Sequence, residues 1–216
     1  MSGVRKEAMA GSFPRYLWLT VFFLVLVWSG YQPRDFYTWM LEVAPAILGL
    51  LVLVQTRQTF PLTSLVYGLI LLHCVILMVG GHYTYAEVPL FDWVRDVTGG
   101  SRNNYDKLGH FVQGFVPAMI AREIIIRKQL VNGEFWINFF SVCFCLAFSA
   151  FYELIEWWVA LLSGNGAEEF LGTQGYIWDT QSDMLMALIG ATIAIASLRS
   201  WHDRLLLMQI DMKTRS

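Results

Sequence analysis

The stretch NYDKLGHFVQGFVP, residues Asn104–Pro117, places charged and polar side chains at the beginning of a segment that is otherwise apolar. Asp106 and His110 are four residues apart, and Gln113 follows three residues later. On a helix this spacing puts all three side chains on one face. Ionisable groups are costly to hold inside a membrane, and those found there usually have a function. The stretch therefore predicts a membrane-spanning helix with a polar site near one end.

The composition is that of a polytopic membrane protein. Of the 216 residues, 56% are hydrophobic and 15% are charged, whereas a soluble domain has about 25% charged residues. The apolar runs are continuous, which favours helices over a membrane β-barrel. We expect an all-α bundle in which residues 1–216 form a single integral membrane domain. The three cysteines lie in apolar runs and are interpreted as small buried hydrophobic residues rather than disulfide partners or metal ligands.

Six apolar segments are long enough to be transmembrane helices. The first follows a short basic segment but precedes no small-residue cleavage site, so we interpret it as an uncleaved helix. The fifth exceeds the usual span length and is expected to tilt or to project from the bilayer. The six predicted helices are Phe13–Gly30, Phe36–Val54, Leu62–Gly80, Tyr105–Ile126, Phe135–Leu162 and Asp179–Leu198.

The distribution of charge orients these helices. With the N-terminus in the cytoplasm, eleven of the 15 lysines and arginines fall on the inner side, as the positive-inside rule requires. Both termini are then cytoplasmic, and twelve of the 17 acidic residues lie in the outer half. Arg122 and Glu123 are expected to be anchors at the inner interface. The two long outer connections, 81–104 and 163–178, are expected to be irregular loops. Tyr85 is expected to belong to an interfacial aromatic belt, and lining the entrance of the site is the alternative.

Three of the predicted helices carry a polar stripe at their outer ends. Adjacent spans are antiparallel, so the beginnings of the fourth and sixth helices lie at the same depth as the end of the fifth. This common depth predicts one shared site. Its polar side chains are Asp106, His110, Gln113, Ser149, Glu153, Glu156, Asp179 and Asp183.

A divalent metal is one interpretation of this site. An imidazole together with carboxylates suits Zn, Mn or Fe. The predicted ligands are His110, Glu153, Glu156 and Asp183. The predicted neighbours that orient these ligands are Asp106, Gln113, Lys107, Asp179 and Gln181.

Two alternatives need no metal. The first is acid–base catalysis, in which a carboxylate orients His110 and a buried glutamate transfers a proton. Its candidate catalytic residues are His110, Glu153, Glu156, Asp106 and Asp183. The second is a structural hydrogen-bonded network that locks the bundle.

Three motifs resemble the YjdF-like family of uncharacterised bacterial inner-membrane proteins. They are YDKLGHF at Tyr105–Phe111, FYELIEWW at Phe151–Trp158 and GTQGYIWDTQSDM at Gly172–Met184. The chain is more distantly similar to VanZ-like membrane proteins, whose pattern has an asparagine where this chain has Ala187. These resemblances imply an inner-membrane protein of unknown function, with a possible link to the cell envelope.

The expected function is that of a small membrane enzyme acting on a lipid or envelope substrate at the outer face. A transporter or cation- or proton-binding protein is the alternative, and a structural or assembly factor is a third. The chain lacks the GxxxxGK[ST], HExxH and GxSxG motifs, which argues against an NTPase, a zincin protease and an α/β-hydrolase. Its basic residues are scattered, so we expect no nucleic-acid partner.

Overall fold

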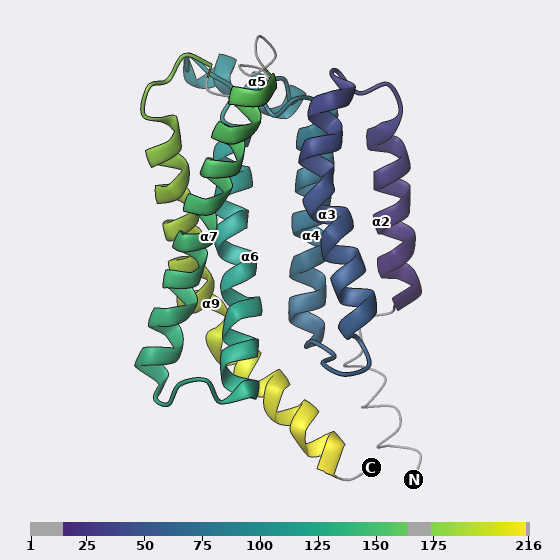
Figure 1. The fold of residues 1–216 in the computed structure, drawn as a ribbon, viewed down its shortest axis with the longest axis vertical. Coiled ribbons are helices and arrows are strands. Elements are labelled where there is room, and N and C mark those ends of the chain that lie inside the picture. Colours follow the sequence, from purple (N-terminus) through teal and green to yellow (C-terminus); the bar gives the residue numbers. More distant parts are fainter. Residues whose placement is uncertain (1–14, 164–173, 215–216) are drawn as a thin grey trace.

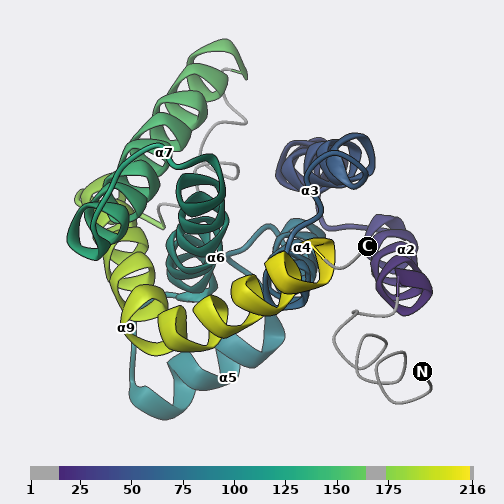
Figure 2. The ribbon, with the colours of Figure 1, turned by 90° about the horizontal axis from the view of Figure 1, so that it is seen from below.

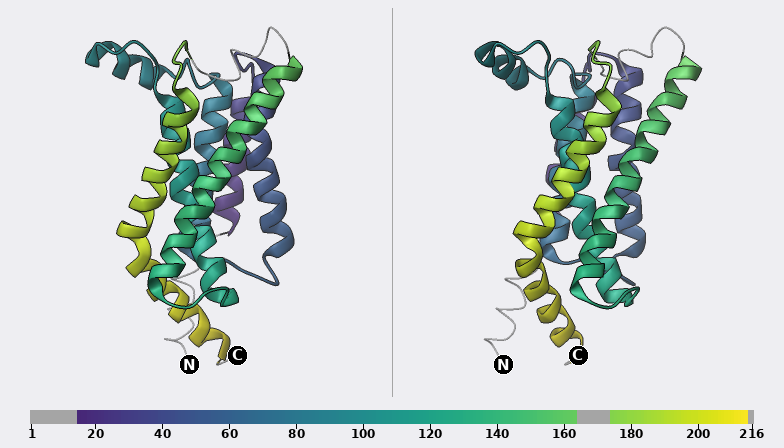
Figure 3. Two further views of the ribbon diagram at one scale, coloured as in Figure 1. Left: turned by 60° about the vertical axis from the view of Figure 1, so that its left-hand side comes forward. Right: turned by 90° about the vertical axis from the view of Figure 1, so that its left-hand side faces the viewer.

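The computed structural model describes residues 15–163 and 174–214, which form an all-α protein. Six helices run side by side along one axis, and α5 lies across one end of the bundle (Figures 1 and 3). The expectation of a helical membrane bundle is confirmed. The helices are α2 (Arg15–Gly30), α3 (Phe36–Thr56), α4 (Ser64–His82), α5 (Pro89–Thr98), α6 (Tyr105–Lys128), α7 (Glu134–Ser163) and α9 (Asp179–Thr214).

Four of these helices, α3, α4, α7 and α9, are long and apolar enough to cross a membrane. Helix α2 is apolar but has only 16 residues, and α6 has 24 residues with charged groups in its first and last turns. Both run parallel to the four (Figure 1). Six spans and cytoplasmic termini remain predictions, and α2 begins at the same end of the bundle at which α9 finishes (Figure 1).

The helices form two groups. Helices α2, α3 and α4 make one group and α6, α7 and α9 the other, with α4 packed against α6 (Figure 2). Helices α6 and α9 approach most closely. A Cβ atom added to Gly114 would overlap the backbone carbonyl of Ala187, and one added to Gly190 would overlap that of Phe111. Small residues let helix backbones meet in lipid, where packing replaces the hydrophobic effect as the driving force.

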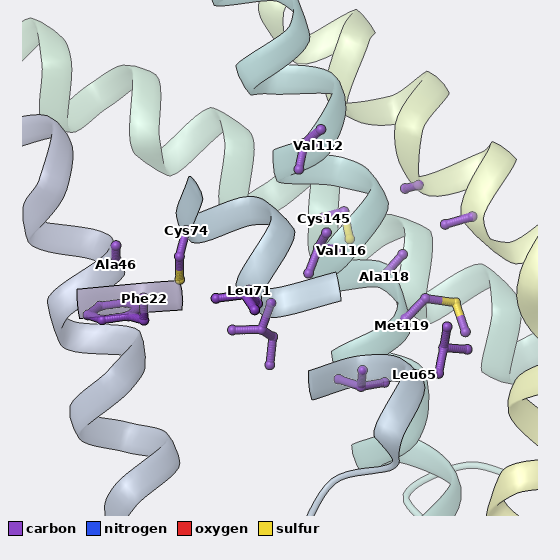
Figure 4. Packing of buried hydrophobic residues seen from close by; sticks show 14 of the residues in the cluster. Phe22, Ala46, Leu65, Leu71, Cys74, Val112, Val116, Ala118, Met119 and Cys145 are labelled. Carbon is purple, nitrogen blue, oxygen red and sulfur yellow. The ribbon is translucent and has the colours of Figure 1, made fainter. Parts of the chain in front are cut away.

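A buried core joins the two groups. Phe22, Val66, Val116 and Met119 are fully buried, and they come from three different helices (Figure 4). Cys74 and Cys145 lie in the same core as free thiols, and Cys143 is an exposed free thiol. Large apolar side chains also cover the outside of α7, where they suit contact with lipid: Phe139, Phe140, Phe144, Phe151 and Trp158 are among them.

The structure corrects the expectation of an irregular connection over residues 81–104, because this segment contains α5. Pro89 occupies the first turn of α5, and Gly99 ends the helix with φ 69°. Proline at the start and glycine just past the end are helix boundary signals that the sequence carried. Leu90, Trp93 and Val97 are exposed and share one face of α5, as in helices that lie in a membrane interface.

Two further helices differ from their predicted bounds. Helix α9 continues to Thr214 rather than stopping at Leu198, and its last part extends beyond the bundle (Figure 1). Helix α7 has 30 residues and leans away from its neighbours (Figure 3), which agrees with the predicted tilt. The predicted outer connection 163–178 is described only from residue 174, and its glycines and glutamates before that point lie outside the described residues.

Candidate functional site

The structure brings the polar stripes of α6, α7 and α9 together at one end of the bundle. We call this group the outer cluster. Its side chains are buried, except that of Lys107, which is partly buried, and all but Gln113 are ionisable. Its members are Asp106, Lys107, His110, Gln113, Glu153, Glu156, Asp179 and Asp183. Gln181, predicted as a neighbour, is exposed instead.

His110 is the centre of the outer cluster. Its Nδ1 lies 2.9 Å from Gln113 Oε1 and 3.7 Å from Glu153 Oε1. Its Nε2 lies 3.4 Å from Asp106 Oδ1 and 3.9 Å from Asp183 Oδ1. An amide oxygen can only accept, so Gln113 holds the tautomer with a proton on Nδ1. The Nε2 atom therefore faces two carboxylates and is placed to exchange a proton with them.

Two basic side chains bind the acidic residues of α9. Lys107 Nζ lies 2.5 Å from Asp179 Oδ1 and 2.6 Å from Asp183 Oδ1. Arg102 Nη1 donates to Asp179 Oδ1 over 2.6 Å. Arg102 was not among the predicted site residues. Its position four residues before Asp106 was the available signal, since that spacing places an Arg one turn from an acid.

A polar strap ties the beginning of α9 to the loop before α6. The backbone N–H of Asn103 donates to Gln174 Oε1 over 3.0 Å, and Gln174 Nε2 donates to the Asn103 carbonyl over 2.8 Å. The Tyr176 ring lies under both Arg102 and Lys107, at 5.7 and 5.8 Å. The described part of the third motif, Gln174–Asp179, therefore covers the outer cluster on the side of the loop before α6.

Two carboxylate oxygens in the outer cluster are buried and lack a hydrogen bond to any described residue: Asp106 Oδ2 and Glu153 Oε1. Asp106 Oδ2 is 3.6 Å from Arg102 Nη2 and 3.9 Å from Lys107 Nζ, which is too far for a good hydrogen bond. Buried polar atoms are nearly always satisfied, so such exceptions need an explanation, such as an ion or a catalytic role. These two atoms make the cluster a candidate site rather than a completed network.

Glu42 of α3 and Tyr85 also belong to the site. Glu42 was not predicted, and Tyr85 was predicted there only as an alternative. Glu42 is buried and interacts with the Tyr85 side chain. Burial raises the pKa of the Tyr85 phenol well above its ordinary value, so the hydroxyl remains a donor. The Tyr85 ring packs where side chains on Gly80 or Gly109 would stand. A single glutamate in the apolar run of α3 was the signal for Glu42.

A cavity of about 900 Å³ opens beside the outer cluster. Its lining comes from α3, α4, α6 and α7, together with Tyr85 and the Thr59–Leu62 connection. At one end Glu42, Asp106, His110 and Glu156 line it, and at the other end Thr56 and Lys128 do. Tyr85 therefore lines the site, in contrast to the expected interfacial belt. The cavity gives a ligand access to the central histidine.

Three ligand atoms in the outer cluster lie close enough to share one metal ion. Atoms from Asp106, His110 and Asp183 are all within 4.8 Å of one another. The predicted ligands were His110, Asp183, Glu153 and Glu156, with Asp106 as an orienting neighbour. The atoms within this distance of one another include one from Asp106 and none from Glu153 or Glu156. One nitrogen and two carboxylate oxygens suit Zn, Mn or Fe. Lys107 already binds Asp183 Oδ1, so a metal would compete with its ammonium or use Oδ2.

A second buried polar group, which we call the inner cluster, lies at the opposite end of α6. Glu123 accepts hydrogen bonds from Thr63, Arg127 and His202. Arg122 makes a two-pronged ion pair with Asp203 (2.6 and 3.1 Å) and also contacts Asn138 and His202. Arg122 and Glu123 are 2% and 0% exposed. They are therefore not the surface anchors that we expected, but join α4, α6, α7 and α9.

Comparison with known proteins identifies the family. A family model described as "Predicted membrane protein (DUF2238)" matches residues 14–204. The chain is also 52% identical over 181 residues to "Inner membrane protein YjdF" of Escherichia coli (strain K12), covering 84% of this chain and 87% of that protein. The chain belongs to the DUF2238 family. No solved structure matches this DUF2238 chain.

The family assignment confirms the resemblance to YjdF-like proteins and the expectation of a multi-pass inner-membrane protein. The matched DUF2238 range includes every residue of the outer and inner clusters. The family description states no activity. The chemistry of this DUF2238 protein must therefore be inferred from the outer cluster itself.

Proposed function

We propose that the protein is a membrane enzyme that uses the outer cluster for acid–base catalysis on a lipid or other envelope substrate. The observation that carries this proposal is His110, which is held by Gln113 on one nitrogen, faces carboxylates on the other, and lines a cavity. A hydrolysis or transfer reaction at the headgroup needs a base that takes a proton from the attacking oxygen and an acid that gives one to the leaving oxygen.

The residues have separate roles in this proposal. Glu153 Oε1 has no hydrogen bond to a described residue and is the base for the attacking hydroxyl or water. His110 Nε2, facing the carboxylates of Asp106 and Asp183, returns a proton to the leaving group. Glu153 takes one proton and His110 Nε2 gives one, so the cycle balances once Glu153 returns its proton to water and Nε2 takes one up. Nδ1, which lies 3.7 Å from Glu153 Oε1, keeps its proton throughout.

A divalent metal on Asp106, His110 and Asp183 would act as a Lewis acid toward a substrate oxygen. Gln113 would keep its present task of orienting the imidazole, as partners behind metal-bound histidines do. Lys107 and Arg102 would continue to neutralise Asp179. A metal on Nε2 would replace His110 as the acid, and Glu153 would keep its role as the base.

The two alternatives have less support. A transporter needs a polar route to the cytoplasm, yet the middle of the cavity is lined by apolar residues such as Val52, Ile70 and Val116, with His73 as a polar exception. A purely structural network would pair its buried oxygens, as the inner cluster does. The unpaired atoms Asp106 Oδ2 and Glu153 Oε1 favour a site that acts on a ligand.

The test uses purified protein in nanodiscs made from a native inner-membrane lipid extract. Mass spectrometry follows new lipid products over time for the wild type, His110→Gln, Glu153→Gln and the control Glu134→Gln, whose carboxylate is exposed at the other end of the bundle. We expect products with the wild type and the control, and at least 100-fold slower turnover in the two cluster variants. Unchanged lipid masses with the wild type would overturn the proposal.

A further inference from the structure

The cavity beside the outer cluster changes character along its length. Its outer end is polar, with Glu42, Tyr85, Asp106 and Glu156. Beyond His110 its walls are largely apolar and include Leu48, Val52, Val116 and Phe148. Ligand sites commonly combine an apolar wall with a few polar groups that fix orientation. The lining therefore fits an amphiphile whose polar end reaches His110.

The cavity is long enough for a lipid chain. Its α3 wall runs from Glu42 to Thr56, which at 1.5 Å per residue is about 21 Å. One leaflet of the hydrocarbon core is about 15 Å deep, half of the usual 30 Å. A chain with its headgroup at the outer cluster would thus lie along the groove past the middle of the bilayer. The volume of about 900 Å³ is in the range of small-molecule sites.

The cavity opens sideways to the bilayer. In the view along the bundle axis, α3 and α7 are separated from each other, and α4 and α6 both lie on the same side of this pair (Figure 2). Side chains from both edges line the cavity and are exposed at the same time: Leu48 is 61% exposed, Val52 56% and Phe148 43%. Such residues face both the cavity and the surrounding lipid. A membrane lipid can therefore enter between α3 and α7 without leaving the hydrocarbon phase.

The charge of the outer end selects the headgroup. Six acidic side chains are buried there, from Glu42 to Asp183, and the basic partners are Arg102, Lys107 and His110. The unpaired oxygens Asp106 Oδ2 and Glu153 Oε1 are acceptors only. Because Asp106 lines the cavity, a headgroup with hydroxyl or amine donors satisfies its Oδ2, whereas a headgroup that is only anionic would be repelled.

We propose that the groove between α3 and α7 binds one hydrocarbon chain of a membrane lipid whose hydroxyl- or amine-bearing headgroup sits against His110. This inference rests on the proposed function, since it names the substrate class of that site. It assigns α3 a role as a side wall of the binding groove. The amphiphile approaches the cluster from within the outer leaflet, beneath the strap formed by Asn103 and Gln174.

Gly49 gives a direct test. It lines the groove, and a Cβ atom there meets nothing within 4 Å, so a larger side chain fills the groove without displacing the backbone. The probe is phosphatidylethanolamine with a diazirine in one acyl chain, incorporated in nanodiscs. Cross-linked peptides are mapped for the wild type, Gly49→Phe and the control Leu51→Phe, which adds bulk on an exposed side of α3.

We expect cross-links on the groove walls of α3 and α6 in the wild type and Leu51→Phe, and at least a tenfold loss of them in Gly49→Phe. Equal labelling of groove and outer surface in all three proteins would overturn the inference. His110→Gln, measured with the same probe, should keep the groove cross-links while losing turnover. Groove cross-links without any turnover in the wild type would defeat the proposed function alone, whereas turnover without groove cross-links would defeat this inference alone.

Discussion

The two ends of α6 carry buried charges that are arranged in opposite ways. In the inner cluster Glu123 accepts five hydrogen bonds from three partners, and Arg122 is bound to Asp203 through both terminal nitrogens. In the outer cluster Asp106 Oδ2 and Glu153 Oε1 have no hydrogen bond to a described residue. The inner cluster is complete without a ligand, and the outer cluster is not.

The inner and outer clusters also differ in their balance of charge. The inner cluster sets the acids Glu123 and Asp203 against Arg122 and Arg127, with His202 between them. The outer cluster has an excess of acids and borders a cavity. Buried charges are tolerated when they are paired, and an unpaired excess destabilises the fold unless it has a use. We infer that buried charge alone does not indicate a functional site, whereas buried charges that lack partners beside a cavity do.

The largest effect on stability is expected in the inner cluster. Glu123→Ala leaves Arg127, His202 and the Thr63 donors without their acceptor, and removing one partner of a buried ion pair costs about 3–5 kcal/mol. Thermal unfolding in detergent measures this loss. The control Glu134→Ala breaks an exposed ion pair with Arg199 and should change stability by less than about 1 kcal/mol. Equal effects for the two variants would mean that the inner cluster does not lock the bundle.

A metal in the outer cluster would give the next largest effect. We expect stoichiometric Zn, Mn or Fe in the wild type by elemental analysis, and its loss in His110→Ala and Asp183→Asn. At 100 times its dissociation constant, the metal would stabilise the wild type by about 2.7 kcal/mol. Glu134→Gln should retain the metal. A metal-free wild type after supply of all three ions would leave acid–base catalysis without metal as the chemistry of the site.

Close packing between the two clusters predicts an intermediate effect. Gly114→Leu forces a side chain against the Ala187 backbone, and overpacking costs about 1–3 kcal/mol. Gly49→Leu, which adds the same atoms in open space, should be nearly neutral in thermal unfolding. If both variants unfold at the same temperature, the contact of α6 with α9 does not set the position of the outer cluster.

The smallest change in stability is expected from Glu153→Gln. The amide removes a charge from an acid-rich group and adds hydrogen-bond donors. The free energy of unfolding should therefore rise, or fall by less than about 1 kcal/mol. Turnover should fall at least 100-fold in the same protein. A loss of stability like that of Glu123→Ala would make the outer cluster a second structural lock, and the comparison between the two ends would fail.

Most residues of the outer cluster were predicted from their helical spacing in the sequence. The stripes of Asp106 with His110, Glu153 with Glu156, and Asp179 with Asp183 were predicted from intervals of three and four residues, and the structure places them together. Arg102 was missed, and Tyr85 was assigned to the aromatic belt, because both lie outside the spans, where helical spacing predicts nothing. Glu42 was missed because no interval in the sequence relates α3 to α6.

The inner cluster also could not be predicted from helical spacing. Arg122 and Glu123 near the end of a span are typical of interfacial anchors, and only the approach of His202 and Asp203 from α9 makes them a network. The helix α9 runs past its predicted end at Leu198, and this extension carries both partners. Because the predicted span ended too early, it excluded His202, which pairs with Glu123, and Asp203, which pairs with Arg122.

The sequence by itself determined that this protein is a helical membrane bundle, and it determined which polar side chains share a helix face. Continuous apolar runs and a repeat of 3.6 residues are local properties of the chain, so they can be recognised without knowing which helices pack together. Only the tertiary structure decided which faces meet, which charges are paired, and where the cavity opens. Pairing depends on distances between helices, and the small residues Gly114 and Gly190 set those distances through packing alone.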